Sequence, residues 1–389
     1  MTYDLIVVGL GAAGAATAYQ AAKRGARVLG IDQYSPPHAL GSSHGDTRST
    51  RVAIGEGEAY VPLVQRSHEI WRELEALSGE SLMVETGGLV ISGPARRATT
   101  HVPQFFEKTL AAAARFSIAH EILGAAAIRA RFPQFDVSAN EIGYYEPGAG
   151  YLRPEACVAA QLALAEVNGA TLKRGERVVD IAEAGDAVRV RTTAGEYSAR
   201  EAVMSMGAWL PDFLEPGLAR HFTVSRQVLY WFAVDEPVAR YEAPRFPIWI
   251  WELQDRSHVI YGFPAVDGAA GGVKIATEQY VRSTRPQDVD RDVTDDEKRA
   301  MHRELVAPYL PGVGAHCIKA VTCLYTATPD FHIAIDRHPR MPRVTVASPC
   351  SGHGFKHSAA LGEALAELAL EGCSRADLSP FGLGRFSNF

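Results

Sequence analysis

Residues 4–32 read DLIVVGLGAAGAATAYQAAKRGARVLGID, the most informative stretch of the chain. Residues 4–8 form an apolar, β-branched run typical of a buried strand, and residues 12–24 have the apolar spacing of a helix. Residues 26–32 have the composition of a second strand. A strand, a turn, a helix and a second strand within about thirty residues predict a βαβ unit with parallel strands.

The turn of this unit carries the pattern G-x-G-x-x-G at Gly9, Gly11 and Gly14. In this context the pattern indicates dinucleotide binding: Gly9 permits a tight turn, Gly11 lets a pyrophosphate approach the backbone, and Gly14 allows close helix–strand packing. The N–H groups at the helix start favour the diphosphate. Asp32 ends the second strand, where a carboxylate accepts from a ribose 2′-OH and disfavours a 2′-phosphate. FAD or NAD therefore fits better than NADP, and a glycine turn without a ligand is the remaining alternative.

Composition excludes several classes of protein. The 389 residues suffice for two packed units or for one large α/β unit with an insertion. Lys and Arg number 39 against 45 Asp and Glu, a net charge of −6, and no block of like charges favours a nucleic acid. The longest apolar run is too short to span a bilayer and lacks a basic region before it. Five scattered cysteines predict neither disulfides nor a metal site, so a cytoplasmic location is expected.

The order of the expected elements indicates a discontinuous architecture. Parallel strands come first, aromatic-rich strands such as VLYWFAV, PIWIWEL and HVIYGFP fill residues 222–280, and a strand at 344–347 precedes a helix at 358–370. We predict an α/β fold in which a Rossmann-like dinucleotide-binding domain is interleaved with an antiparallel-sheet α+β substrate domain. The first domain comprises residues 1–84, 151–220 and 320–389, and the second comprises residues 85–150 and 221–319.

Five further stretches share one resemblance. They are GSSHGDTRSTRVAIGEG (41–57), YGFP (261–264), CLYTATPD (323–330), SGHGFK (351–356) and LSPFGLGRF (378–386). In this order they resemble the monomeric sarcosine oxidase and N-methyltryptophan oxidase family of D-amino-acid-oxidase-like flavoproteins, over essentially the whole chain. The resemblance implies that the Rossmann-like domain binds FAD and that the 8α-methyl group of FAD is joined covalently to Cys323. The alternative for Cys323 is a small buried hydrophobe.

Three cationic residues follow the second strand. His44, Arg48 and Arg51 lie in one short segment, where positive side chains would stabilise negative charge on a flavin and on oxygen. The resemblance assigns His44 and Arg48 to the flavin as cofactor-binding and catalytic residues. It assigns Arg51, together with Lys356, to the substrate carboxylate. Surface ion pairs are the alternative for these arginines.

Other site residues follow from the same resemblance. Lys274 is expected to contact flavin N5 through water and to activate oxygen, and Tyr261 is expected in the substrate pocket, both as catalytic residues. The remaining expected cofactor contacts are Val178, Gly207, Gly352, His353, Gly354 and Lys356.

The sequence departs from the family near the expected substrate site. Ile54 replaces a pocket tyrosine, and Glu278 stands where the sarcosine enzymes have a histidine. Residues 249–251 (WIW), with Tyr230 and Trp231, could line a pocket for a larger or apolar amine substituent. Core packing is the alternative for these aromatic residues.

We therefore predict a flavin-dependent oxidation of a secondary, N-methyl or N-alkyl, amino acid. Hydride passes from the carbon next to nitrogen to flavin N5, the imine hydrolyses to an amine and an aldehyde (formaldehyde for an N-methyl group), and O2 becomes H2O2. A cyclic imino acid oxidase acting on proline- or pipecolate-like rings is the alternative within the fold, and an NAD-dependent dehydrogenase or a non-catalytic nucleotide-binding protein are alternatives outside it. The expected partners are a small amino acid and O2, with no metal, nucleic acid or membrane, and the chain is expected to be a monomer.

Overall fold

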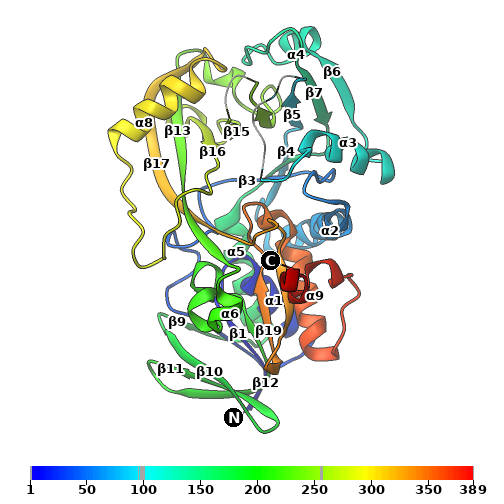
Figure 1. The fold of residues 1–389 in the computed structure, drawn as a ribbon, viewed down its shortest axis with the longest axis vertical. Coiled ribbons are helices and arrows are strands. Elements are labelled where there is room, and N and C mark those ends of the chain that lie inside the picture. Colours follow the sequence, from blue (N-terminus) through cyan, green and yellow to red (C-terminus); the bar gives the residue numbers. More distant parts are fainter. Residues whose placement is uncertain (1, 95, 97–100, 255–256, 389) are drawn as a thin grey trace.

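The computed structural model describes residues 2–94, 96, 101–254 and 257–388. Two large sheets lie one beyond the other along the long axis (Figure 1). The sheet nearer the N-terminus contains the βαβ unit, and the other contains the aromatic-rich strands. The chain passes between the two sheets several times, so both are assembled from distant segments.

The first sheet is built on parallel strands. Its strands are β1 (Thr2–Val8), β2 (Val28–Asp32), β9 (Thr171–Arg174), β10 (Val178–Ala184), β11 (Ala187–Thr192), β12 (Glu196–Met204), β18 (Ala334–His338) and β19 (Met341–Ser348). β1 pairs in parallel with β2 and with β12, β2 with β9, and β12 with β19. The carboxyl ends of β1 and β2 therefore lie side by side, where doubly wound folds bind nucleotides.

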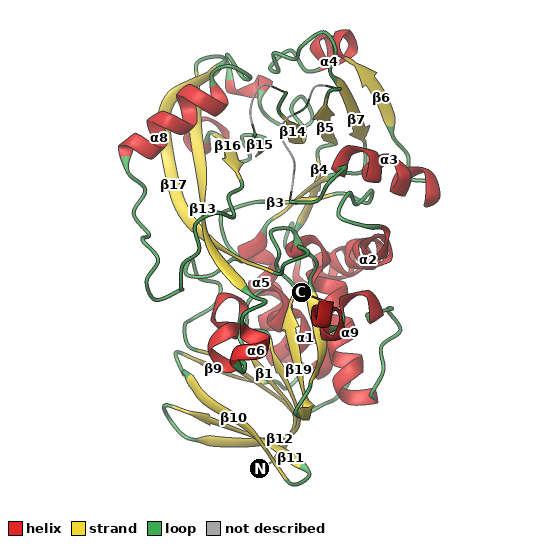
Figure 2. Ribbon diagram, viewed as in Figure 1, coloured by secondary structure: helices red, strands yellow, loops and turns green. Residues whose placement is uncertain are grey.

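Helices cover one face of this sheet (Figure 2). They are α1 (Ala12–Lys23), α2 (Val61–Ser78), α5 (Pro154–Val167) and α9 (Ser358–Glu371). Side chains alternate across a strand, so Leu5 and Val7 of β1 pack into the helical core while Ile6 and Val8 pack into the core on the opposite face. Burial on both faces explains why β1 is a continuous apolar run rather than an alternating one.

The second sheet is mostly antiparallel. Its strands, in spatial order, are β17 (Val313–Ala327), β13 (Thr223–Val234), β16 (Val273–Thr277), β15 (Val259–Phe263), β14 (Ile248–Glu252), β5 (Gly88–Ser92), β7 (Ile142–Glu146) and β6 (Glu121–Gly124). The long strands β13 and β17 extend from this sheet toward the first one (Figure 1). The domain boundary expected at residue 320 falls inside β17, so Cys323 lies on a strand of the second sheet.

Smaller elements complete the fold. β3 (Arg48–Thr50), β8 (Gly150–Leu152) and β4 (Met83–Glu85) form a three-stranded sheet. The remaining helices are α3 (Phe105–Arg115), α4 (Ala125–Arg131), α6 (Pro216–Ala219), α7 (Gly268–Gly271) and α8 (Asp295–Met301). The residues just before β3 contact the second sheet, because the Lys274 side chain on β16 donates to the carbonyl oxygens of Gly45 and Thr47.

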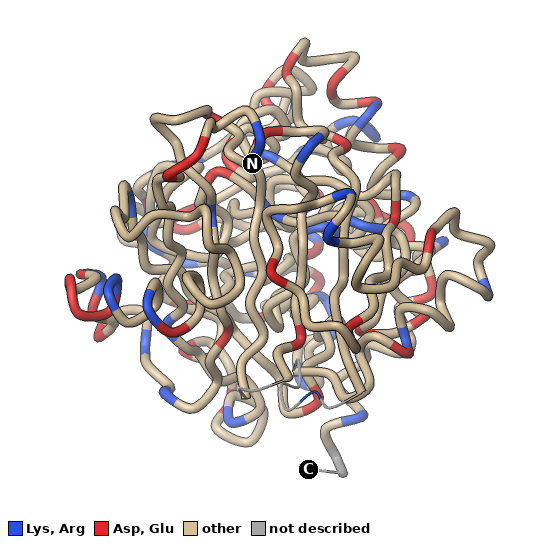
Figure 3. The backbone as a smooth tube through the Cα atoms, turned by 90° about the horizontal axis from the view of Figure 1, so that it is seen from above, with Lys and Arg blue, Asp and Glu red and all other residues tan. Residues whose placement is uncertain are grey.

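The predicted α/β fold class is confirmed: a Rossmann-like parallel sheet and a largely antiparallel sheet are interleaved along the chain. In the view of Figure 3, acidic and basic residues are interspersed along the chain. Across the described part of the chain, no helix has the length and apolarity needed to cross a bilayer. The same residues contain no group of three or more His, Cys, Asp or Glu able to hold a metal.

Candidate active site

A cavity of about 1270 Å³ lies where the two sheets meet and continues along the first sheet. It brings together nearly all site residues expected from the sequence. They are Gly9, Gly11, Asp32, Arg48, Arg51, Val178, Gly207, Tyr261, Lys274, Cys323, Gly352, His353, Gly354 and Lys356. Gly14 and His44 do not line it.

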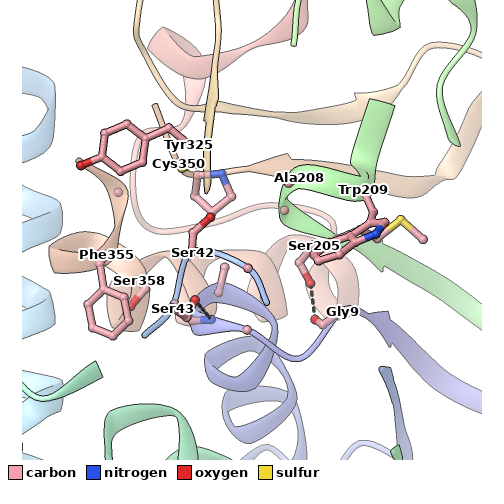
Figure 4. Close-up of a pocket in the computed structure, with 18 of the residues that line it drawn as sticks. Gly9, Ser42, Ser43, Ser205, Ala208, Trp209, Tyr325, Cys350, Phe355 and Ser358 are labelled. Atoms are coloured by element: carbon pink, nitrogen blue, oxygen red, sulfur yellow. Dashed lines mark hydrogen bonds between the residues drawn. The ribbon is translucent and has the colours of Figure 1, made fainter. Parts of the chain in front are cut away.

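The turn after β1 forms one end of the cavity. Gly9 has a φ of +86°, and a Cβ atom there would lie 2.6 Å from the carbonyl oxygen of Ser205. A Cβ on Gly14 would lie 1.8 Å from the carbonyl oxygen of Gly9, so Gly14 fixes the approach of α1 to the strand. The Ser205 hydroxyl donates to the Gly9 carbonyl at 2.8 Å, and the Ala12 N–H donates to the Ser43 hydroxyl at 3.1 Å (Figure 4). Gly11, Ala12 and Ala13 line the cavity, so the start of α1 faces it and is suited to an anion.

Asp32 lies beside this turn. One carboxylate oxygen accepts from the Leu10 N–H and the other from the Tyr34 N–H, both at 2.8 Å. Burial raises the pKa of this carboxyl group. A carboxylate has about four lone-pair sites, so acceptor capacity remains for ribose hydroxyls. The cradle of Gly9, Gly11 and the α1 start, with Asp32 beside it, fits the diphosphate and ribose of a dinucleotide such as FAD.

Cys323 and Arg48 meet in the middle of the cavity. The Arg48 guanidinium donates to the Ser42 carbonyl at 2.8 Å and lies 3.6 Å from the Cys323 sulfur. Burial raises the pKa of the Cys323 thiol, and the nearby Arg48 opposes this effect. A buried thiol next to a fixed cation can react as a thiolate toward a group held in the cavity.

Lys274 lies close to this pair but comes from β16. Its ammonium donates to the carbonyl oxygens of Gly45 at 2.7 Å and Thr47 at 2.8 Å, and it lies 4.6 Å from the centre of the Phe263 ring. Burial, followed by repulsion from Arg48, holds the pKa of Lys274 well below its ordinary value. The amine is thus held rigidly in a site where its charge is poorly screened.

His44 differs from the expectation of a cation facing the cofactor. It is buried behind the cavity wall, and its Nε2 has no partner among the described residues. Burial and the neighbouring Arg48 and Lys274 lower the pKa of His44 to about 3. The imidazole is therefore neutral at physiological pH, because two adjacent cations and low polarity disfavour a third charge.

Arg51 and Lys356 converge, as expected, but on a glutamate that the sequence did not indicate. The Glu56 carboxylate accepts from Arg51 at 2.8 Å and from Lys356 at 3.0 Å. All three side chains are buried. Desolvation raises the pKa of Glu56, but the two cations outweigh it and hold the pKa well below its ordinary value. Burial lowers the pKa of Lys356 to about 8.

Replacing Glu56 by glutamine is expected to reduce the free energy of unfolding by about 3 kcal/mol or more at pH 7, because two buried cations lose their counter-ion. The folded-state pKa of Glu56 lies below its unfolded value, so this stabilisation is present above about pH 4.5 and is lost as pH falls through the folded pKa. Urea unfolding of both proteins across this range should show the difference shrinking at low pH. Glu58→Gln is the matched control, since Glu58 pairs with Arg115 at the surface and should change stability by less than about 1 kcal/mol. A loss independent of pH would contradict the charge argument.

Aromatic side chains also line the cavity, some of them packed near Cys323. The hydroxyl groups of Tyr261 on β15 and Tyr325 on β17 are 3.3 Å apart, and both residues line the cavity. Trp249 and Ile250 also line it, whereas Tyr230, Trp231 and Trp251 do not. The Trp251 indole N–H donates to Glu141 inside the core of the second sheet, at 2.7 Å. Core packing therefore accounts for most of the aromatic residues that we considered as pocket residues.

Glu278 follows β16 and lines the cavity. Its Oε2 accepts from the Tyr280 hydroxyl at 3.2 Å and lies 3.0 Å from Nδ1 of His101. His101 in turn stacks on His353 with 5.5 Å between ring centroids. The expectation that Ile54 occupies the substrate neighbourhood is wrong: Ile54 is fully buried in the helical core and does not line the cavity.

Sequence reasoning missed Glu56, His101 and Tyr325. For Tyr325 a signal existed, because it lies two residues after Cys323 on a strand and must face the same side. For Glu56 the signal was an acid between two glycines in the motif that supplies Arg51. No local pattern marks His101, which reaches the cavity only through tertiary structure.

Comparison with known proteins agrees with this geometry. The family model described as "FAD dependent oxidoreductase" matches residues 4–368. A monomeric sarcosine oxidase from Streptomyces avermitilis is 41% identical over 383 residues, which cover 98% of this chain and 97% of that protein. An N-methyl-L-tryptophan oxidase from Escherichia coli is 35% identical, with 99% of this chain and 100% of that protein covered.

Solved structures show the same fold. NikD, an unusual amino acid oxidase essential for nikkomycin biosynthesis, superimposes in its open form with a TM-score of 0.83 at 26% identity, covering 98% of this chain and 97% of NikD. A glycine oxidase from Geobacillus kaustophilus has a TM-score of 0.76 at 20% identity, covering 98% of both chains.

Proposed function

The chain belongs to the family of FAD dependent oxidoreductases, and we propose that it oxidises a secondary, N-methyl or N-alkyl, amino acid with O2 as acceptor. The supporting observation is one continuous cavity with a dinucleotide cradle at one end and two buried cations, Arg51 and Lys356, at the other. Relatives named as sarcosine and N-methyl-L-tryptophan oxidases, both acting on N-methyl amino acids, agree with this substrate class. The family decides between FAD and NAD, which the glycine pattern did not.

Bound FAD would supply the acceptor for the hydride that leaves the carbon next to the substrate nitrogen. In the proposed site Arg51 and Lys356 hold the substrate carboxylate, and Tyr261 and Tyr325 bound the space in which the amine lies. The substrate must enter with a neutral amine, since its lone pair assists loss of hydride. Water hydrolyses the imine, so an N-methyl substrate and O2 give the demethylated amino acid, formaldehyde and H2O2.

We assign finer roles to three residues. Cys323 joins FAD covalently, as its position beside Arg48 in the cavity suggests. Lys274 stabilises negative charge that develops on oxygen during its reduction. His44 serves as a neutral packing residue between Arg48 and Lys274 rather than as a cation. We further propose a monomer in the cytoplasm, with the first sheet holding the cofactor and the second sheet forming the substrate side.

The activity is tested with purified protein and a panel of N-methyl and cyclic amino acids, assayed for peroxide and formaldehyde together. The proposal expects equal amounts of both products from N-methyl compounds. Peroxide without formaldehyde, from proline- or pipecolate-like rings alone, would favour the cyclic imino acid oxidase. A colourless protein without peroxide release from any amine would overturn the proposal.

The pKa of Lys356 predicts how kcat/KM depends on pH. The free substrate amine has a pKa of roughly 10, so kcat/KM should rise with pH as the neutral amine forms. Lys356 loses its charge above about pH 8, which weakens carboxylate binding, so the rise should level off near that pH. Lys356→Arg keeps its charge, and its profile should continue to rise toward the amine pKa. Identical pH profiles of kcat/KM for the native protein and Lys356→Arg would show that Lys356 does not bind the substrate carboxylate.

A further inference from the structure

Glu278 is one of the acids that line the cavity and have no part in the proposed reaction. Its side chain is 16% exposed, and both of its hydrogen-bonding neighbours, His101 and Tyr280, contact the same oxygen, Oε2. Among the described residues, Oε1 has no hydrogen-bond partner, and Glu278 lines the cavity wall. One carboxylate oxygen is thus held in place, and the other is available to a ligand.

The position of Glu278 on the wall follows from strand geometry. Lys274 lies on β16 and Glu278 is the first residue after this strand, so four residues of extended chain separate them by roughly 13 Å. Ala276, between them, pairs with Tyr261 on β15 and lies in the same apolar cluster as Tyr261. Along this wall, Glu278 therefore lies beyond Ala276, on the side away from Lys274.

Arg51 and Lys356, the two cations proposed to hold the substrate carboxylate, are here called the clamp. Neither of them forms an ion pair with Glu278 among the described residues. Arg51 and Lys356 face Glu56, and a bound substrate carboxylate would make two anions for two cations. Glu278 is close enough to raise the pKa of Lys356, although burial lowers this pKa overall. A third anion beside the clamp repels a purely anionic substrate and attracts a positive group.

We propose that Glu278 selects an amino acid whose side chain carries a cation, such as an alkylammonium group, in addition to its secondary amine. This inference rests on the proposed function and specifies its substrate class. The clamp holds the carboxylate, the secondary amine lies beside the tyrosines, and the distal cation contacts Oε1 of Glu278. His101 and Tyr280 act as positioning residues because they fix Oε2.

The test compares Nα-methyllysine with Nα-methylnorleucine, which lacks only the terminal amine. The native enzyme should prefer Nα-methyllysine in kcat/KM by about 10- to 100-fold, as for a charged hydrogen bond in a partly buried site. Glu278→Gln, which keeps the shape of the side chain, should reduce this ratio to about threefold or less while leaving oxidation of Nα-methylnorleucine nearly unchanged. No preference in the native enzyme would overturn the inference. Equal losses for both substrates would also overturn it, since Glu278 would then act on the reacting amine or on the fold.

Calorimetric titration separates this inference from the proposed function. The native protein should bind lysine at least about tenfold more tightly than norleucine, and Glu278→Gln should bind the two alike. If no N-methyl compound releases peroxide but this difference is found, the proposed function fails and the cation site stands. If the two amino acids bind equally to the native protein, the cation site is overturned whether or not the enzyme is active.

Discussion

After precipitation in acid, the native protein should keep its yellow colour in the pellet, whereas Cys323→Ser should release essentially all of it to the supernatant. Cys323 lies in the cavity beside the Arg48 guanidinium, which opposes the rise in the pKa of the thiol that burial causes. A thioether from this sulfur would anchor FAD and withdraw electron density from it. Removing it should therefore also lower kcat, by at least about tenfold, or 1.4 kcal/mol in the barrier.

Cys350 provides the control for this experiment. It too lines the cavity, and it packs against the apolar cluster that contains Cys323. Cys350→Ser should keep the colour in the pellet. Colour retained by Cys323→Ser, or lost from Cys350→Ser, would show that Cys323 is not the attachment site.

The second large effect is expected for Lys274→Met, which should slow the reaction with oxygen by about 10²- to 10³-fold. Lys274 provides an amine fixed by two carbonyl oxygens in a buried site, where a positive charge acts strongly on a nearby developing anion. Bleaching of the yellow colour by substrate without oxygen should change by less than about tenfold. Stopped-flow measurement of the two half-reactions separates these rates, and it requires only that the variant binds FAD.

Lys319→Met is the matched control. Its ammonium lies 4.5 Å from the centre of the Trp231 ring, which Lys274 also approaches at 5.4 Å, but Lys319 is exposed and paired with Asp46. Neither half-reaction should change in this variant. If Lys274→Met slowed both half-reactions equally, Lys274 would have a structural role. If reoxidation by oxygen were unchanged, Lys274 would have no part in the reaction with oxygen.

The parallel strands and their helix were predictable because short-range patterns specify them. Apolar strand runs, helical spacing and three glycines within thirty residues define the βαβ unit, and the structure contains it with the expected boundaries to within two residues. The helix expected at residues 358–370 is present as α9. The discontinuous order of the sheets was predictable from the change in strand composition along the chain.

The charge states of the site were not predictable in this way. His44 looked like a cation in sequence, but its neutrality depends on burial and on Lys274, which comes from β16. The position of residue 320 inside β17 and the burial of Ile54 in the helical core also depend on how distant strands and helices pack. Such features depend on the environment of a side chain rather than on its neighbours in sequence.

The sequence and its family resemblance therefore determined the fold class, the dinucleotide cradle and a set of site residues nearly all of which line the cavity, because each lies in a recognisable stretch of the chain. Only the tertiary structure placed Glu56 between Arg51 and Lys356, which are 305 positions apart in the chain, and Glu278 beside His101. Electrostatic pairing acts through space, and its strength depends on desolvation, which exists only once the chain has folded.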